Sequence, residues 1–208
     1  MIYEARSYRI SRGKVPEFLR LFAEGYETRS EHSRISAMLY TEIGPLNQVI
    51  HIWPYADMGE REKIRVEAAK DPNWPPKVSH LLETMQSEIF VPLPFTPTMA
   101  SGDVGPVFEW REYTMRADGQ PALVENWSSA IEERVKMSPL VMAMVTECGA
   151  LNKFVHIWGY ESLEHRRAVR DEAREKGIWP PRNVSGGPDP ILTQECKICF
   201  AADYSPVK

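Results

Sequence analysis

The chain has 208 residues, of which 43% are hydrophobic and 26% are charged, and its formal net charge is −4. This composition is typical of a folded globular protein and excludes global disorder. The negative net charge argues against a general attraction to nucleic acid or to an anionic membrane, and no apolar run approaches the roughly 20 residues that span a bilayer. The opening residues pass directly into a strand-like pattern without a signal or transit peptide, so we expect a cytoplasmic protein.

The first half of the sequence predicts four strands and two helices. Apolar residues recur at helical spacing through the first helical segment, and Gly44-Pro45-Leu46-Asn47 is typical of a hairpin turn. Asp57 and Glu60 form a capping-box pattern that predicts the start of the second helix. In chain order we expect a strand at 2–10, a helix at 14–31, strands at 35–43 and 48–55, a helix from 57 to about 70, and a strand near 84–91.

The sequence repeats itself at a spacing of 105 residues. Segment 2–8 overlays 107–113, segment 41–47 overlays 146–152, and segment 51–55 overlays 156–160. No gap is needed until Trp74-Pro75-Pro76, which matches Trp179-Pro180-Pro181, and the second copy then carries about three extra residues. A stretch rich in proline and glycine separates the copies, so we expect domains at 1–92 and 107–208 with a linker at 93–106.

A period of 105 residues is too long for a solenoid unit, which typically has 20–50 residues. Each copy is instead predicted to be a small α+β domain with the order βαββαβ, which is the ferredoxin-like arrangement. We therefore expect two tandem ferredoxin-like units that pack against each other as a pseudo-dimer within one chain.

The run Gly-Pro-Leu-Asn-Gln-Val-Ile-His-Ile-Trp-Pro-Tyr at 44–55, followed by Arg61, Arg65 and Asp-Pro-Asn-Trp at 71–74, resembles the core motif of the NIPSNAP family. The second copy repeats most of it, with Lys176-Gly177 in place of the Asp-Pro. The resemblance implies a dimeric α+β barrel, in which the two units join their sheets and carry their helices outside. It implies no settled biochemical role and no known cofactor, although the superfamily includes haem-handling proteins and small monooxygenases.

Strand alternation separates the residues of 48–55 into two faces. Ile50 and Ile52 share one face, and His51 and Trp53 share the other. We expect the isoleucines to face the helices and the His/Trp side to face the barrel interior. Glu4, Arg6 and Tyr8 share one face of the first strand, and we expect them to point toward the barrel interior or its rim.

These residues predict a pocket in each half. His51 and His156 are the candidate catalytic residues, because imidazole can act as acid or base near neutral pH. The candidate ligand-binding residues supply an arginine clamp for an anion and flat aromatic walls for a planar ligand, and they are Glu4, Arg6, Tyr8, Trp53, Glu109, Arg111, Tyr113 and Trp158. Alternatively, the Glu, Arg and His side chains could satisfy one another as a purely structural hydrogen-bond network.

Three further patterns each leave two interpretations open. The pairs Arg61/Arg65 and Arg166/Arg170 could bind an anion or belong to a solvated salt-bridge face. Trp74 and Trp179 could anchor a loop or close the mouth of a pocket. Cys196 and Cys199 could be redox-active or metal-binding, but on a strand they would point to opposite faces, which favours a structural role, and no metal-ligand set is predicted.

Two functions remain open at this stage. The first is an enzyme or binder that acts on a small planar or carboxylated metabolite in a barrel pocket. The second is a non-catalytic scaffold for protein–protein interaction. Free sheet edges would also permit a homo-oligomer beyond the internal pseudo-dimer.

Overall fold

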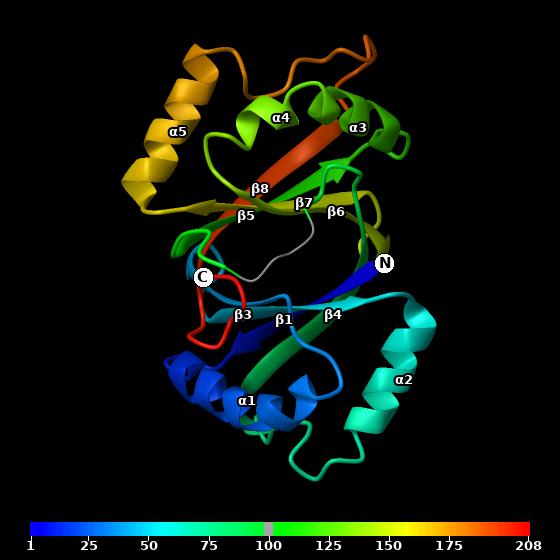
Figure 1. Ribbon diagram of the computed structural model, residues 1–208, viewed down its shortest axis with the longest axis vertical. Helices are drawn as coiled ribbons and strands as arrows, with labels where there is room; N and C mark the ends of the chain where they lie inside the picture. The colour runs from blue at the N-terminus through cyan, green and yellow to red at the C-terminus, as the bar shows by residue number, and fades with distance from the viewer. Residues whose placement is uncertain (98–101) are drawn as a thin grey trace.

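The structure, a computed structural model, describes residues 1–97 and 102–208. Eight strands close into one barrel, and helices lie on two opposite sides of it (Figure 1). The first half contains β1 (Ile2–Ile10), α1 (Val15–Ser30), β2 (Ala37–Ile43), β3 (Gln48–Tyr55), α2 (Met58–Ala68), the 3-10 turn η1 (Ser79–Leu81) and β4 (Leu82–Pro92). The second half contains β5 (Val107–Met115), α3 (Gln120–Ser128), α4 (Ile131–Arg134), β6 (Leu140–Cys148), β7 (Lys153–Tyr160), α5 (Leu163–Glu175) and β8 (Ile191–Ala201). Within the described residues, no helix is both long and apolar enough to cross a membrane.

Local side-chain chemistry fixes where these elements begin and turn. The Asp57 carboxylate accepts a hydrogen bond from the backbone N–H of Glu60 at 2.9 Å, and Glu60 accepts one in return from the N–H of Ala56, which confirms the capping box. The β2–β3 and β6–β7 hairpins turn at Asn47 and Asn152, whose φ angles of 57° and 58° lie in the left-handed region that asparagine tolerates.

The helical segment of the second half is broken where the first half has one continuous helix. The helix α1 has 16 residues, whereas its counterpart is divided into α3 with 9 and α4 with 4. At the break, the Ser129 hydroxyl donates to the carbonyl of Asn126 at 2.7 Å, and serine competes in this way with helical hydrogen bonding. The corresponding residue of α1 is Glu24, which is a good helix former.

Each half has the strand order of a ferredoxin-like sheet, as the sequence predicted. The order is β4-β1-β3-β2 in the first half and β8-β5-β7-β6 in the second. The strand β2 pairs with β8 and β4 pairs with β6, so the two sheets join at both edges. This closed ring leaves no free strand edge in the described barrel, and the sheet-edge argument for further oligomerisation therefore does not apply.

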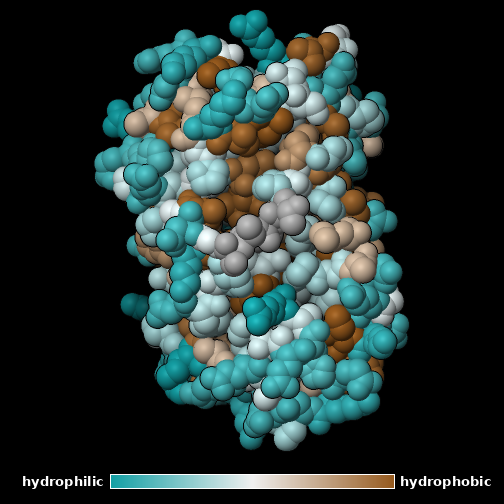
Figure 2. Space-filling model, viewed as in Figure 1, coloured by the Kyte–Doolittle hydropathy of each residue, from teal (hydrophilic) through white to brown (hydrophobic). Residues whose placement is uncertain are grey.

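Short segments after the last strand of each half pack onto the other half. Phe95 stacks on Trp127 with ring centroids 5.4 Å apart, and Tyr204 stacks on Phe22 at 6.5 Å. Figure 2 shows mainly hydrophilic residues over α2 and α5, and apolar residues gathered beside α4 toward the middle of the molecule. This reciprocal packing joins the halves in addition to the strand pairing.

The barrel interior is filled by apolar side chains from all eight strands, among them Tyr3, Ala5, Leu39, Ile50, Ile52, Phe90, Phe108, Trp110, Met142, Met144, Val155, Ile157 and Cys199. The expectation that the isoleucines face the helices is therefore wrong. The His51/Trp53 side of β3 and the Glu4/Arg6 side of β1 lie outside the barrel, beneath α1 and α2.

The physical reason is that both faces of each sheet are buried. Strand alternation separates the two faces, but it does not say which one is inside. An eight-stranded barrel is just wide enough to be filled by side chains, so its interior favours apolar residues. The polar face instead gains hydrogen-bond partners from the helices.

Candidate functional site

A buried carboxylate on β1 is held by arginines from two elements. Glu4 is 0% exposed and accepts hydrogen bonds from Arg6 at 2.8 Å, from Arg61 of α2 at 2.8 and 3.0 Å, and from the hydroxyl of Ser87 at 2.7 Å. Arg65 lies 3.8 Å away. Burial by itself would raise the pKa of Glu4, but these donors lower it to about 2.

The second half repeats this arrangement around Glu109. It accepts from Arg166 at 2.5 Å and from Arg111 at 2.8 Å, and Arg170 lies 3.5 Å away. The thiol of Cys196 takes the place of the Ser87 hydroxyl at 3.4 Å. The pKa of Glu109 is likewise lowered to about 2, against the effect of burial. The helix arginines therefore contact a buried carboxylate and are not simply part of a solvated face.

Each strand arginine also bonds to a tyrosine on the same face. The Nε of Arg6 donates to the hydroxyl of Tyr8 at 2.7 Å, and Arg111 does the same to Tyr113 at 2.7 Å. The Glu/Arg part of the predicted cluster is thus a satisfied hydrogen-bond network, in agreement with the structural alternative.

The two predicted catalytic histidines are buried, at 2% and 1% exposure. The indole Nε1 of Trp53 donates to Nδ1 of His51 at 2.6 Å, and Trp158 donates to Nδ1 of His156 at 2.8 Å. An indole N–H can only donate, so Nδ1 is the acceptor and the imidazole proton is on Nε2. Neither Nε2 has a hydrogen-bond partner among the described residues.

This geometry leaves neither neutral imidazole with a free lone pair. Burial, together with Arg6, lowers the pKa of His51 to about 3, and burial lowers that of His156 well below its usual range. Both rings are therefore neutral at physiological pH. In this arrangement they can donate a hydrogen bond from Nε2, and their predicted role in acid–base catalysis stays a prediction.

The same tautomer does not fit an axial haem ligand. A histidine that ligates iron through Nε2 needs its lone pair there, whereas in this site Nε2 carries the proton. Among the residues that the structure describes, no three His, Cys, Asp or Glu side chains are grouped so that they could hold a metal ion.

An arginine that the sequence-based predictions did not include lies at the centre of each site. Arg29 of α1 is 2% exposed and donates to the hydroxyl and carbonyl of Ser33 at 2.7 and 3.1 Å, and to the hydroxyl of Tyr55 at 3.2 Å. Its guanidinium lies 4.2 Å from the centre of the Trp53 ring. The repeat could have identified it, because Arg29, Ser33 and Tyr55 all recur 105 residues later.

In the second half, Arg134 makes the same contacts. It is 2% exposed and donates to the hydroxyls of Ser138 at 2.9 Å and Tyr160 at 3.0 Å, and it lies 4.0 Å from the centre of the Trp158 ring. The Tyr160 hydroxyl in turn contacts Glu109 at 3.2 Å. Across residues 1–97 and 102–208, neither Arg29 nor Arg134 forms a salt bridge with a carboxylate. Burial lowers the pKa of both, yet an arginine remains charged.

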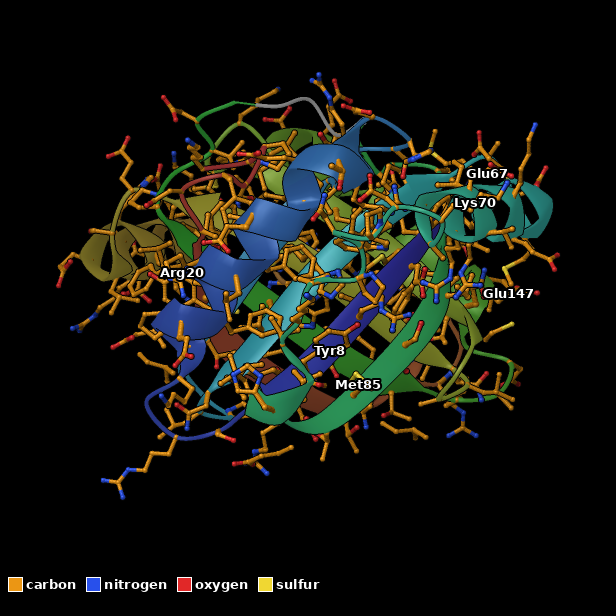
Figure 3. The ribbon with its side chains drawn as sticks, turned by 90° about the horizontal axis from the view of Figure 1, so that it is seen from below. Tyr8, Arg20, Glu67, Lys70, Met85 and Glu147 are labelled. Atoms are coloured by element: carbon orange, nitrogen blue, oxygen red, sulfur yellow. The ribbon has the colours of Figure 1, made fainter. Side chains whose placement is uncertain are left out.

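A cavity of about 400 Å³ lies between the sheet and the helices of the first half. Strands β1 and β3 contribute its floor, α1 contributes Phe22 and Arg29, and the segment after α2 closes it with Trp74 and two prolines. Figure 3 shows Tyr8 and Met85 on the outer face of this sheet, beside the helices. Its lining includes Arg6, Tyr8, Phe22, Arg29, His51, Trp53, Arg65, Ala69, Trp74, Val78 and Met85.

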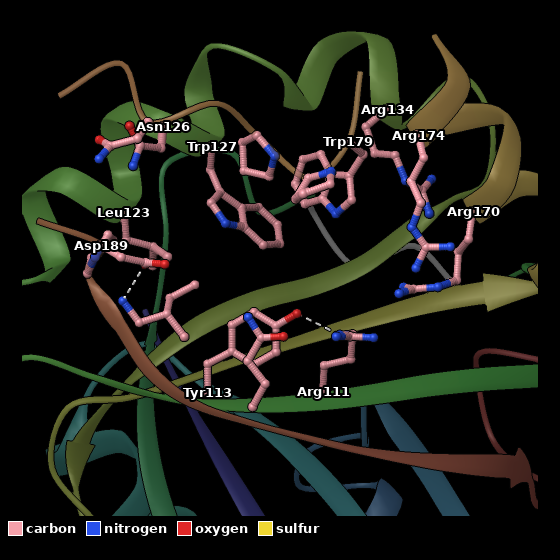
Figure 4. A pocket seen from close by; sticks show the side chains of 16 residues that line it. Arg111, Tyr113, Leu123, Asn126, Trp127, Arg134, Arg170, Arg174, Trp179 and Asp189 are labelled. Atoms are coloured by element: carbon pink, nitrogen blue, oxygen red, sulfur yellow. Dashed lines mark hydrogen bonds between the residues drawn. The ribbon is translucent and has the colours of Figure 1, made fainter. Parts of the chain in front are cut away.

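A cavity of about 420 Å³ occupies the same place in the second half (Figure 4). Arg111, Tyr113 and Arg134 line it, but His156 and Trp158 do not. Trp127 stands where the first half has Phe22, and its larger ring lies 4.7 Å from that of His156. The indole therefore separates the second histidine from the cavity.

The two loop tryptophans take part in both of the roles considered for them. Trp74 packs edge-on against Phe22 at 5.6 Å and Trp179 against Trp127 at 4.6 Å, and both line the cavities. The two cysteines of β8 point to opposite faces, as the strand spacing predicted. Cys199 lies in the barrel interior and Cys196 contacts Glu109 on the helix side, and burial raises the pKa of both thiols.

The sequence matches the NIPSNAP family over two segments, residues 3–97 and 108–206. The human protein NipSnap homolog 3A is 28% identical over 100% of this chain and 86% of its own length. The mouse protein NipSnap homolog 3B is 30% identical over 99% of this chain and 85% of its own length. Both alignments therefore extend across the two matched segments of this chain.

Solved structures resemble either one half or the whole barrel. A NIPSNAP domain protein from Burkholderia xenovorans is 36% identical over 47% of this chain and 100% of its own, with a TM-score of 0.45. A Fusobacterium nucleatum protein with a provisional monooxygenase assignment covers 96% of this chain and 91% of its own, with a TM-score of 0.69 and 10% identity. At that identity the likeness shows the fold alone, which is that of the dimeric α+β barrel proteins.

Proposed function

The chain belongs to the NIPSNAP family, and from the geometry of its two cavities we propose that it binds small planar anions, such as aromatic carboxylates, between the sheet and the helices. The site lies on the outer face of each half-sheet and not in the barrel interior. Each half therefore supplies one pocket, and the two pockets are related but not identical.

The observation that carries the proposal is the pair of buried arginines. A charge removed from water is costly unless an opposite charge compensates for it. Arg29 and Arg134 are 2% exposed, line the cavities, and have hydroxyl and aromatic partners in place of a carboxylate. A ligand carboxylate in the cavity would provide the missing negative charge and could accept two parallel hydrogen bonds from the guanidinium.

The remaining lining residues support a planar ligand. In the first pocket, Phe22, Trp53 and Trp74 provide flat apolar walls, and Tyr8 lies on the floor. A cavity of about 400 Å³ is in the range of pockets that hold small molecules. Within this proposal, His51 donates a hydrogen bond from its unpartnered Nε2. Arg6 and Tyr8, which the sequence predicted as ligand-binding residues, line the cavity while they are bonded to each other.

The test compares a charged ligand with its neutral counterpart. We expect 2-naphthoate to bind the full-length protein, as measured by calorimetry, and 2-naphthamide to bind at least about tenfold more weakly, because a charged hydrogen bond adds roughly 1.5–3 kcal/mol. The double variant Arg29→Met, Arg134→Met removes the two buried charges and should abolish the difference between the ligands.

The matched control is Arg20→Met, which makes the same change on the exposed face of α1, where Arg20 pairs with Glu24. It should bind 2-naphthoate like the unchanged protein. Equal binding of the acid and the amide, or full binding by the double variant, would count against the proposal and would favour the interaction-scaffold hypothesis.

A further inference from the structure

The two pockets differ at equivalent positions of the two halves. Ala69 of the first pocket is replaced by Arg174 of the second, and Val78 is replaced by Asn183, each at the spacing of 105. The strand register adds a third difference, because Tyr8 pairs with Met85 whereas Tyr113 pairs with Gln194. At all three positions, an apolar residue of the first pocket is replaced by a polar or charged residue in the second.

These differences surround a shared centre. The buried arginine, the strand arginine, the tyrosine and the loop tryptophan are the same in both pockets. Ala69, Met85, Arg174, Asn183 and Gln194 are exposed, whereas Val78 is buried, so two of the three changes lie toward solvent in both pockets. The inner parts thus share their cations and differ where Trp127 replaces Phe22 and covers His156, and the outer parts differ in polarity.

Arg174 adds a cationic group to the outer part of the second pocket. Its side chain is 55% exposed and its one salt bridge among the described residues, to Asp171 at 3.1 Å, is itself exposed. An exposed pair of this kind contributes little, roughly 0–1 kcal/mol, so the guanidinium is free to exchange it for a ligand. Figure 4 shows Arg134, Arg170 and Arg174 together on one flank of the pocket.

Its neighbours on that flank already have other partners or lie deeper. Arg170 lies 3.5 Å from Glu109, and Arg134 is buried against Trp158. The only pocket-lining acid among the described residues, Asp189, bonds to the backbone N–H of Ile191 at 2.9 Å. The second pocket can therefore offer one anion site inside, at Arg134, and a second one near the mouth, at Arg174.

We propose that the two pockets select different ligands: the second takes a planar dianion held at both ends, and the first takes a planar monoanion with an apolar outer end. This inference rests on the proposed anion-binding function and adds to it the ligand preference of each pocket. Ala69 and Met85 give the outer end of a first-pocket ligand an apolar surface. The half-exposed Arg65 of the first pocket lies 3.8 Å from Glu4 and has its counterpart in Arg170, so Arg174 is one cation more in the second pocket.

The experiment isolates each pocket in the full chain and compares 2-naphthoate with 2,6-naphthalenedicarboxylate by calorimetry at low ionic strength. Arg29→Met leaves only the second pocket, and there we expect the dicarboxylate to bind about tenfold more tightly, since one more charged contact corresponds to about 1.4 kcal/mol. Arg134→Met leaves only the first pocket, where 2-naphthoate should bind at least as tightly as the dicarboxylate.

Exchange of the outer residue should move the preference. In the Arg29→Met background, Arg174→Ala should weaken the binding of the dicarboxylate about tenfold and the binding of 2-naphthoate less than about twofold. In the Arg134→Met background, Ala69→Arg should create a preference for the dicarboxylate. The control Arg167→Ala removes an 85% exposed arginine from the same helix and should leave the affinity for both ligands unchanged.

The outcomes separate the two proposals. If 2-naphthoate binds and both pockets prefer the same one of the two ligands, the proposed difference in selectivity is overturned and the anion-binding function is left intact. Absence of 2-naphthoate binding to the unchanged protein would overturn the anion-binding function itself.

Discussion

Trp53 donates a hydrogen bond from its indole Nε1 to Nδ1 of His51 at 2.6 Å, and this contact determines which nitrogen of the buried imidazole carries the proton. The pair also links the two layers of the first site, because Trp53 lies beneath the guanidinium of Arg29 while His51 packs against Tyr8 and Phe22. Its consequences can be measured in the stability of the protein.

Neutral, buried His51 should make the protein less stable in mild acid. The pKa is 6.5 for an ordinary histidine and about 3 here, so the unfolded chain binds a proton that the folded chain does not. Above pH 6.5 the histidine is neutral in both states and does not affect the free energy of unfolding. As the pH falls from 6.5 toward 3, the free energy of unfolding decreases by about 1.4 kcal/mol for each pH unit. Between pH 6.5 and 5 we expect a loss of about 2 kcal/mol in the free energy of unfolding from His51 alone.

The variant His51→Asn retains an oxygen acceptor for the Trp53 indole but has no titratable ring. Denaturant unfolding at pH 6.5 and 5 measures the loss in the free energy of unfolding between these pH values. In the variant this loss should be smaller by about 2 kcal/mol than in the unchanged protein, whatever the overall stability of the variant. His32→Asn, an exposed histidine, serves as the control and should keep the dependence of the unchanged protein. An unchanged slope in His51→Asn would show that the imidazole is not held neutral.

Removal of the Glu4 carboxylate should destabilise the fold strongly. Glu4→Gln leaves Arg6 and Arg61 beside a neutral amide, and removal of one partner from a buried ion network costs on the order of 3 kcal/mol. Glu24→Gln changes an exposed glutamate that pairs with Arg20 and should cost less than about 0.5 kcal/mol. Urea unfolding at neutral pH measures both, and equal effects would contradict the network.

The stability from Glu4 should also depend on pH. Its pKa is lowered from 4.5 to about 2, so the contribution is complete above pH 4.5 and is lost as the pH falls toward 2. The difference between the unchanged protein and Glu4→Gln should therefore narrow over that interval. A difference that stays constant down to pH 2.5 would mean that the pKa of Glu4 is not lowered in the folded protein.

The barrel interior should behave as a closely packed core. Ile52 is 0% exposed and lies in the interior cluster, so Ile52→Ala should lower the free energy of unfolding by about 2–5 kcal/mol. Val66→Ala on α2, where the side chain is 55% exposed, should change it by less than about 0.5 kcal/mol. A small effect of Ile52→Ala would contradict a closely packed barrel interior.

Ligand binding should stabilise the protein only where the buried arginines are present. At a concentration 100 times the dissociation constant, 2-naphthoate should add about 2.7 kcal/mol to the free energy of unfolding for each occupied pocket. Thermal unfolding of the Arg29→Met, Arg134→Met variant should show no such increase. Retention of the full increase in that variant would place the ligand elsewhere.

The sequence by itself determined the duplication, the element order and which residues share a strand face. These features are encoded locally: a repeat is visible in the letters, a capping box lies within four residues, and strand alternation follows from a period of two. The grouping of Glu4, Arg6 and Tyr8 on one face, and of His51 and Trp53 on the other strand, was correct for the same reason.

Only the tertiary structure decided which face is inside and which residues complete the site. Alternation is unchanged when a sheet is turned over, so the sequence could not place Ile52 in the barrel and His51 beneath the helices. The proton position of His51 depends on Trp53, and the burial of Arg29 depends on the packing of α1 against β3. Burial is a property of the assembled layers. The repeat marks Arg29 and Arg134 as a matched pair, but it does not show that their side chains are buried.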